Sequence, residues 1–210
     1  MQAPTPSLRL YWFPLSGHAH RAELMLSLLG LTFERVLVNL PEREQKAPEF
    51  LAKNPFGQVP VLEDGDVTVA DSTAILVYLA KRYDPAGSWL PADAVLAARV
   101  QRWLAVAAGP LAQGPAAARA SVVFRKQRDA AACERAQLLL QVLESELDMR
   151  EYLVGSGPTI ADVALYTYIA HVPEGGVSLE PYAAVRAWLT RIEALPGFVG
   201  MRKSPLPESS

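Results

Sequence analysis

The sequence predicts an α/β domain followed by an all-α domain. Strand-like and helix-like segments alternate over residues 8–83. An Asp-Gly pair at residues 64–65 separates two short apolar runs, which is a hairpin signal. After Asp84 the chain is rich in alanine and leucine at helical spacing, and no convincing strand follows. We therefore expect a first domain over residues 1–83, a linker over 84–92 and a helical domain over 93–210.

The first domain begins with a β-α-β pattern. The apolar and aromatic run Leu8–Phe13 predicts a strand that ends at Pro14. Alanine and leucine recur at helical spacing over residues 19–29, which predicts a helix that ends at Gly30. Phe33–Leu40 then returns to strand character with spaced valines.

The remainder of this domain has a β-β-α pattern. The polar segment Glu42–Ala52 is compatible with a short helix. Two short strands are expected over Val59–Glu63 and Val67–Ala70, and Asp71–Tyr83 carries a helical apolar face. These elements predict a small four-stranded sheet with helices packed on it.

The second domain consists of helices separated by glycine and proline. Gly114-Pro115 is expected to break the chain. The segment that starts at Thr159 resembles a capping box, with Asp162 where glutamate or glutamine is more usual. We expect helices over Ala94–Ala108, Ala117–Arg128, Ala130–Arg150, 159–170 and Pro181–Leu195.

Composition excludes several classes of function. Apolar residues make up 50% of the chain and charged residues 20%, which argues against disorder. The net charge of −2 provides no basic surface for nucleic acid or for a membrane. The single cysteine, Cys133, precludes an intrachain disulfide, and the N-terminus lacks the features of a signal peptide. We therefore expect a cytoplasmic protein.

Two short motifs suggest a binding site for a peptide-like ligand. A cis bond between Val59 and Pro60 would turn the backbone of Val59 outward, where it can pair with a ligand backbone. Asp71 and Ser72 come at a helix start, where free N–H groups favour a carboxylate and Asp71 suits an amino group. In the alternative interpretation, Pro60 only shapes a turn and Asp71 is only a helix cap.

Together with the segments NPFGQVPVL, VADSTAILVYLA and PTIADVALYTY, these motifs resemble the cytosolic glutathione transferase superfamily, in particular its serine-type and nu-like bacterial members. The resemblance covers most of the chain. It implies a thioredoxin-like N-terminal domain, a helical-bundle C-terminal domain, a homodimer, glutathione as co-substrate and no metal. It also implies that the backbone of Val59, before cis-Pro60, pairs with the cysteinyl part of glutathione, and that Asp71 and Ser72 hold the γ-glutamyl end.

The resemblance assigns roles to further residues. Lys46 would meet the glycine carboxylate of glutathione, assisted by Gln58. Phe56 would either insert into a partner subunit or pack beneath its own loop. Thr159 and Asp162 would form a structural cap in the helical domain.

Ser16 corresponds to the catalytic serine of serine-type members. Lowering a thiol pKa by about two units requires roughly 2.7 kcal/mol of preferential thiolate stabilisation. A hydrogen bond to a charged group contributes about 1.5–3 kcal/mol and a helix N-terminus about 0.3–1 kcal/mol. A Ser16 hydroxyl at the start of the first helix would therefore supply most of the required stabilisation. Alternatively, Ser16 is only a helix cap.

His18 departs from the common pattern, because many related members have asparagine at this position. It would donate a second hydrogen bond to the sulfur, or become charged near its ordinary pKa, or instead cap the turn. His20 is expected to lie behind the site or to be exposed, and the two histidines have no further clustered ligand for a metal. Tyr11 is the alternative hydrogen-bond donor to the thiolate if neither Ser16 nor His18 fills this role. The loop before the first helix contains no cysteine, because Cys133 lies in a predicted helix of the second domain. Thiol exchange through a cysteine in this loop is therefore excluded.

Three functions follow from these residues. The first is a detoxifying transfer of glutathione to an apolar electrophile, with Ser16 stabilising the thiolate. The second is glutathione-dependent reduction of disulfides or peroxides, with His18, His20 and Arg21 near the mouth of the site. The third is a binding protein that retains the fold without the chemistry.

Overall fold

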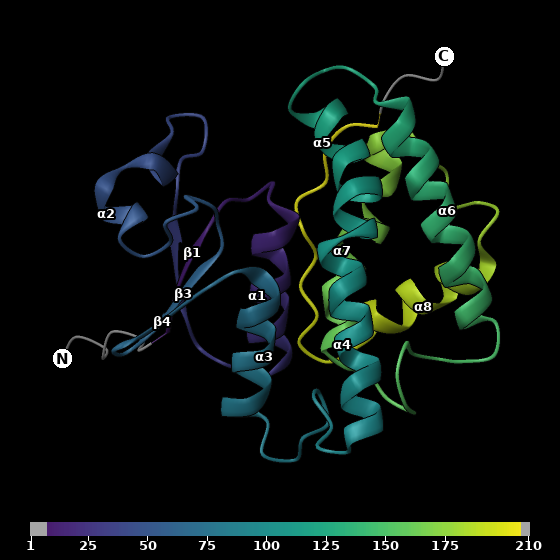
Figure 1. The fold of residues 1–210 in the computed structure, drawn as a ribbon, viewed down its shortest axis with the longest axis horizontal. Coiled ribbons are helices and arrows are strands. Elements are labelled where there is room, and N and C mark those ends of the chain that lie inside the picture. The colour runs from purple at the N-terminus through teal and green to yellow at the C-terminus, as the bar shows by residue number, and fades with distance from the viewer. Residues whose placement is uncertain (1–7, 207–210) are drawn as a thin grey trace.

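The structure, a computed structural model, describes residues 8–206. A small sheet lies at one side, a helical bundle at the other, and α1 (Gly17–Leu28) and α3 (Ser72–Tyr83) lie between them (Figure 1). The short helix α2 (Pro48–Leu51) lies on the opposite side of the sheet. Both α1 and α3 contact α7 (Ile160–Ala170), so the two halves pack directly against each other.

The sheet has four strands in the order β2-β1-β3-β4. They are β1 (Leu8–Trp12), β2 (Glu34–Leu37), β3 (Val61–Asp64) and β4 (Val67–Ala70). The pair β1–β2 is parallel, whereas β1–β3 and β3–β4 are antiparallel. The predicted hairpin is present, with Gly65 at a φ of 57°. This arrangement confirms the thioredoxin-like first domain.

Helix bounds in the first domain differ from the predicted ones where side chains cap the backbone. Helix α1 begins at Gly17, two residues earlier than expected, because the Ser16 side chain accepts a backbone N–H of the first turn. The segment expected as one short helix forms a 3-10 turn, Glu44–Lys46, and then α2. The proline that starts α2 is compatible with the first helical turn only.

The second domain is all-helical. Helix α7 is buried on all sides, and its predicted capping box of Thr159 and Asp162 is confirmed. No helix within residues 8–206 is long and apolar enough to cross a bilayer. The other elements are α4 (Ala94–Ala108), a π-helical turn (Ala112–Ala116), α5 (Ala117–Val123), α6 (Ala130–Leu147), a 3-10 turn (Val172–Gly175) and α8 (Ala183–Glu193).

The prediction that Gly114-Pro115 interrupts the helical structure is wrong. The backbone stays helical there and widens into the π-helical turn, which runs directly into α5. Pro115 has no N–H to donate, and a widened turn accommodates the missing backbone bond. Helix α5 in turn ends at Val123, earlier than predicted, and Lys126 adopts a φ of 55°.

Close contacts join α1 to the second domain. A Cβ atom on Gly17 would lie 2.6 Å from the Tyr168 ring, so only glycine allows this approach. His20 is 2% exposed, with Nδ1 2.8 Å from Thr167 Oγ1 and Nε2 2.9 Å from the carbonyl oxygen of Val199. His20 therefore ties α1 to α7 and to the C-terminal segment, and the alternative in which His20 is exposed is wrong.

Candidate functional site

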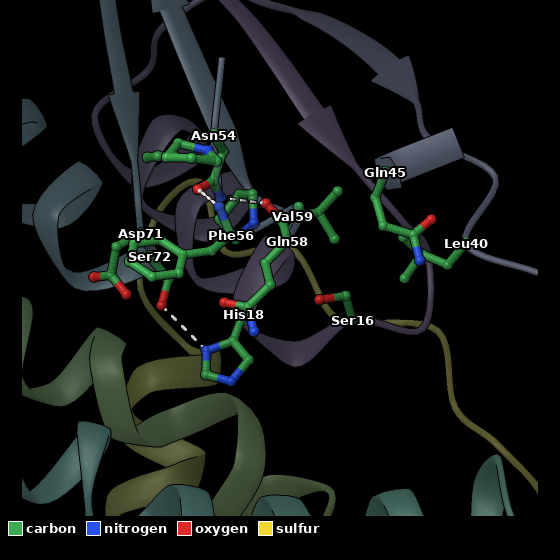
Figure 2. A pocket seen from close by; sticks show the side chains of 14 residues that line it. Ser16, His18, Leu40, Gln45, Asn54, Phe56, Gln58, Val59, Asp71 and Ser72 are labelled. Atoms are coloured by element: carbon green, nitrogen blue, oxygen red, sulfur yellow. Dashed lines mark hydrogen bonds between the residues drawn. The ribbon is translucent and has the colours of Figure 1, made fainter. Parts of the chain in front are cut away.

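A cavity of about 650 Å³ opens at the edge of the first domain. Its wall is formed by the start of α1, the loop before β3 and the start of α3 (Figure 2). The lining residues are Ser16, His18, Leu40, Gln45, Asn54, Pro55, Phe56, Gly57, Gln58, Val59, Pro60, Ala70, Asp71 and Ser72. Seven of the predicted site residues are thus brought together, although they are far apart in the sequence.

Ser16 lies on the cavity wall and caps α1 at the same time. Its Oγ accepts the backbone N–H of Ala19 at 3.2 Å. Because this bond uses an oxygen lone pair, the hydroxyl proton is left to donate to a ligand. The start of α1, where the helix dipole is positive, also forms part of the cavity wall. Capping and ligand contact are therefore compatible roles for this residue.

A tight loop carries the backbone of Val59 to the cavity. Asn54 is 4% exposed, its Nδ2 donates to the carbonyl oxygen of Gln58 at 2.8 Å, and its Oδ1 accepts the N–H of Phe56 at 3.1 Å. Gly57 has a φ of 59°, and a Cβ there would lie 2.6 Å from a backbone oxygen of Gln45. The Val59-Pro60 bond is cis, as predicted. Sequence reasoning missed Asn54, whose only signal was its place in a breaker cluster.

Asp71 caps α3 with one of its two carboxylate oxygens. Oδ1 accepts the N–H groups of Thr73 and Ala74 and the Thr73 hydroxyl, at 2.8, 3.1 and 2.6 Å. Oδ2 takes part in none of these bonds. Burial alone would raise the pKa of Asp71, but the hydrogen bonds from Thr73 and Ala74 outweigh it and lower the pKa below its ordinary value. Asp71 is therefore an anion at neutral pH.

Behind this carboxylate, buried Ser72 and Arg21 form a cluster with the half-buried His18. Nη1 of Arg21 is 3.0 Å from Nδ1 of His18 and 3.2 Å from Oγ of Ser72, and the latter two atoms are 3.2 Å apart. A guanidinium only donates, so Nδ1 of His18 accepts and the ring carries its proton on Nε2. Burial and the neighbouring Arg21 cation lower the pKa of His18 to about 3. The ring is neutral at pH 7, and the expectation that it charges near its ordinary pKa does not fit this environment.

Comparison with known proteins identifies the family. Residues 6–81 match the family model "Glutathione S-transferase, N-terminal domain", and residues 96–196 match "Glutathione S-transferase, C-terminal domain". The chain belongs to the glutathione S-transferase family.

Relatives cover nearly the whole transferase. Glutathione S-transferase 3 of Zea mays is 36% identical over 97% of this chain and 98% of that protein. A glutathione S-transferase structure from Xanthobacter autotrophicus is 33% identical, with a TM-score of 0.85 over 92% of this chain and 96% of that one. A transferase homolog from Drosophila mojavensis, solved with bound glutathione, is 30% identical, with a TM-score of 0.83 over 90% and 88% of the two chains.

The remaining predicted residues of the transferase differ in their relation to the cavity. Gln58 lines the cavity, whereas Lys46 is an exposed residue whose Nζ donates to the carbonyl oxygen of Phe56 at 3.0 Å. Gln45, which sequence reasoning missed, contributes to the wall with a buried Oε1. The Phe56 side chain is 77% exposed, so it does not pack beneath its own loop.

The geometry does not support Tyr11 as the alternative catalytic group, and it places Cys133 away from the cavity, as expected. The Tyr11 hydroxyl donates to Glu63 at 2.9 Å, and Tyr11 does not line the cavity. Cys133 is buried in α6, with its Sγ 3.5 Å from the carbonyl oxygen of Gly175. Within residues 8–206 no group of three or more His, Cys, Asp or Glu side chains is arranged to hold a metal ion.

Proposed function

We propose that this transferase binds glutathione in the cavity and activates its thiol for attack on an electrophilic, mostly apolar substrate. The observation that carries the proposal is the Ser16 hydroxyl, which lies on the cavity wall with its proton free to donate. A hydrogen bond from this hydroxyl and the dipole of α1 both favour the thiolate over the thiol. In the attack a sulfur–carbon bond forms while the bond from that carbon to its leaving group breaks, the leaving group departs with the bonding electrons, and the thiol proton leaves to solvent.

Glutathione has a matching partner at each of its ends. The free Oδ2 of Asp71 suits the γ-glutamyl ammonium. Because Asp71 already accepts two N–H groups in the first turn of α3, it is Ser72, with its N–H and hydroxyl at the helix start, that suits the γ-glutamyl carboxylate. The backbone of Val59 suits the cysteinyl part. Lys46, on the rim, suits the glycine carboxylate, with Gln58 beside it. Binding therefore positions the thiol near Ser16.

We assign to His18 the support of Ser72 rather than contact with the sulfur. Nδ1 of His18 is engaged with Ser72 and Arg21. In Figure 2 the other ring nitrogen points away from the Ser16 hydroxyl. Thiol activation thus belongs to Ser16 in this proposal.

An ultraviolet titration of bound glutathione tests the proposal. Thiolate absorbance should be visible by about pH 6–7 in the wild type, well below the ordinary thiol pKa. Ser16→Ala should lose this thiolate while glutathione binding is nearly unchanged. Ser16→Thr, which keeps both the hydroxyl and the helix cap, is the matched control and should retain it. Binding without a shifted thiol pKa would contradict catalysis and favour a non-catalytic binding protein.

Reduction of disulfides or peroxides with a second glutathione receives less support. This function requires cationic or donor groups near the mouth, but Arg21 and His20 are 1% and 2% exposed and His18 carries no charge. Arg21 and His20 are therefore not available to attract a second thiol, and His18, which lines the cavity, has no charge with which to attract it. Conjugation and disulfide reduction assays on the same protein separate the two activities.

The proposal includes a cytoplasmic homodimer. Support comes from Phe56, a large apolar side chain that is 77% exposed beside the cavity. Burial of this ring in a partner subunit would remove it from water. Sedimentation at working concentration should show a dimer that Phe56→Ser weakens. A stable 22.8 kDa particle would contradict the dimer.

A further inference from the structure

A buried ion pair lies between α5 and the 3-10 turn that follows α7. Nε of Arg119 is 2.7 Å from Oε2 of Glu174, and the two residues are 1% and 3% exposed. Burying such a pair brings little net stability, because desolvation offsets the attraction. Stability alone therefore does not explain its presence.

Arg119 also contacts the loop that precedes Ser16. Its Nη1 donates to the carbonyl oxygen of Leu15 at 2.9 Å. The N–H of the same peptide group, that of Ser16, donates to the carbonyl oxygen of Phe13 at 3.0 Å. The peptide group before Ser16 is thus held at both ends, and one of these bonds comes from the helical domain.

The guanidinium itself is firmly held. The second oxygen of Glu174, Oε1, is 2.6 Å from Nδ1 of His171 and accepts the N–H of Ser204 at 3.1 Å. The turn lies close against α5, since a Cβ on Gly175 would be 2.6 Å from the backbone nitrogen of Arg119. Arg119 therefore has little freedom to shift away from Leu15.

We propose that Arg119, oriented by Glu174, is a positioning residue for the thiol-activating hydroxyl of Ser16. The inference rests on the proposed function. By fixing the Leu15–Ser16 peptide group, Arg119 sets the direction of the Cα–Cβ bond of Ser16 and hence of its hydroxyl. A donor held in place before the ligand arrives stabilises a developing anion without reorganisation.

Arg119→Lys tests this positioning role. Lysine keeps the positive charge opposite Glu174. The guanidinium of Arg119 donates from Nε to Glu174 and from Nη1 to Leu15, and a single ammonium group does not reproduce both hydrogen bonds. We expect kcat/KM for glutathione near pH 6.5 to fall about tenfold through a raised thiol pKa, while glutathione affinity stays within about twofold. The matched control is Arg102→Lys, at an exposed ion pair with Glu146 between α4 and α6, which should behave as wild type.

Hydrogen–deuterium exchange supplies a readout that does not depend on activity. Backbone amides of residues 16–20 should exchange faster than in wild type in Arg119→Lys. In Arg102→Lys they should exchange at the wild-type rate. A wild type that forms no thiolate would defeat the proposed function, whereas the exchange data would still report whether Arg119 holds the loop.

Two results would overturn the inference. One is an unchanged bound-thiol pKa in Arg119→Lys with only a lower melting temperature, which would make Arg119 merely structural. The other is an unchanged exchange rate over residues 16–20. Should Arg119→Lys fail to fold, Glu174→Gln carries the same test, because it keeps the shape of Glu174 and removes the charge that orients Arg119; an unchanged thiol pKa there would also overturn the inference.

Discussion

At the residue scale, the candidate chemistry depends on side chains that perform a structural task with one atom and leave another for the ligand. Ser16 accepts a backbone N–H with its oxygen and keeps its proton. Asp71 caps α3 through Oδ1 alone. The capping role of Ser16 and Asp71 therefore leaves the proposed ligand contact possible at both residues.

Asp71→Asn separates the two tasks of Asp71. Asparagine is an equally good cap and tolerates the observed φ of 80°, so the melting temperature should change little. Removal of the negative charge should raise the dissociation constant for glutathione about tenfold, as measured by calorimetry. Asp66→Asn, at the exposed tip of the hairpin, is the control and should have no effect. An unaltered dissociation constant in Asp71→Asn would reject the proposed orientation of glutathione.

At the element scale, helix α7 depends on Asp162, which joins three parts of the second domain. Its carboxylate accepts the N–H of Thr159 at 2.8 Å, which completes the capping box. It also accepts the N–H of Leu153 at 3.0 Å and the indole N–H of Trp188 at 2.9 Å. All these donors lose their partner together when the carboxylate is removed.

Asp162→Ala should therefore be more costly than the loss of an ordinary cap. We expect the free energy of unfolding to fall by about 2–4 kcal/mol, because several buried donors become unpaired. Asp93→Ala removes the exposed cap of α4 and should cost only about 1 kcal/mol. Urea unfolding of both variants measures the difference, and equal costs would show that the buried donors find other partners.

At the scale of the whole molecule, a buried network of charged groups connects the two halves. Burial alone would raise the pKa of Glu174, but hydrogen bonds from His171 and Ser204, together with the Arg119 cation, lower it to about 2. The C-terminal segment, which passes between the halves, joins this network at Ser204 and contacts α1 through His20 (Figure 1).

This depressed pKa gives a pH dependence of known sign. Ionised Glu174 stabilises the folded chain above its ordinary pKa of 4.5, and the contribution is lost as the pH falls from 4.5 towards about 2. Glu174→Gln should lower the melting temperature at neutral pH and flatten its fall over this acid range. Glu49→Gln, at an exposed position, should leave the profile unchanged. Parallel melting profiles of Glu174→Gln and wild type would contradict the assignment.

Local patterns in the sequence determined the order of strands and helices, the hairpin at Gly65 and the capping box at Thr159. They also predicted that Ser16, Val59 and Asp71 lie near the starts of elements, and all three line the cavity. These features depend on residues a few positions apart, so periodicity and turn chemistry reveal them.

Only the tertiary structure decided the neutral state of His18, the burial of His20 and the contact of Arg119 with Leu15. The last contact joins residues 104 positions apart. The pKa of a histidine and the partner of a buried arginine depend on what other segments pack against them. No pattern along the chain carries that information, because it arises when the two domains pack together.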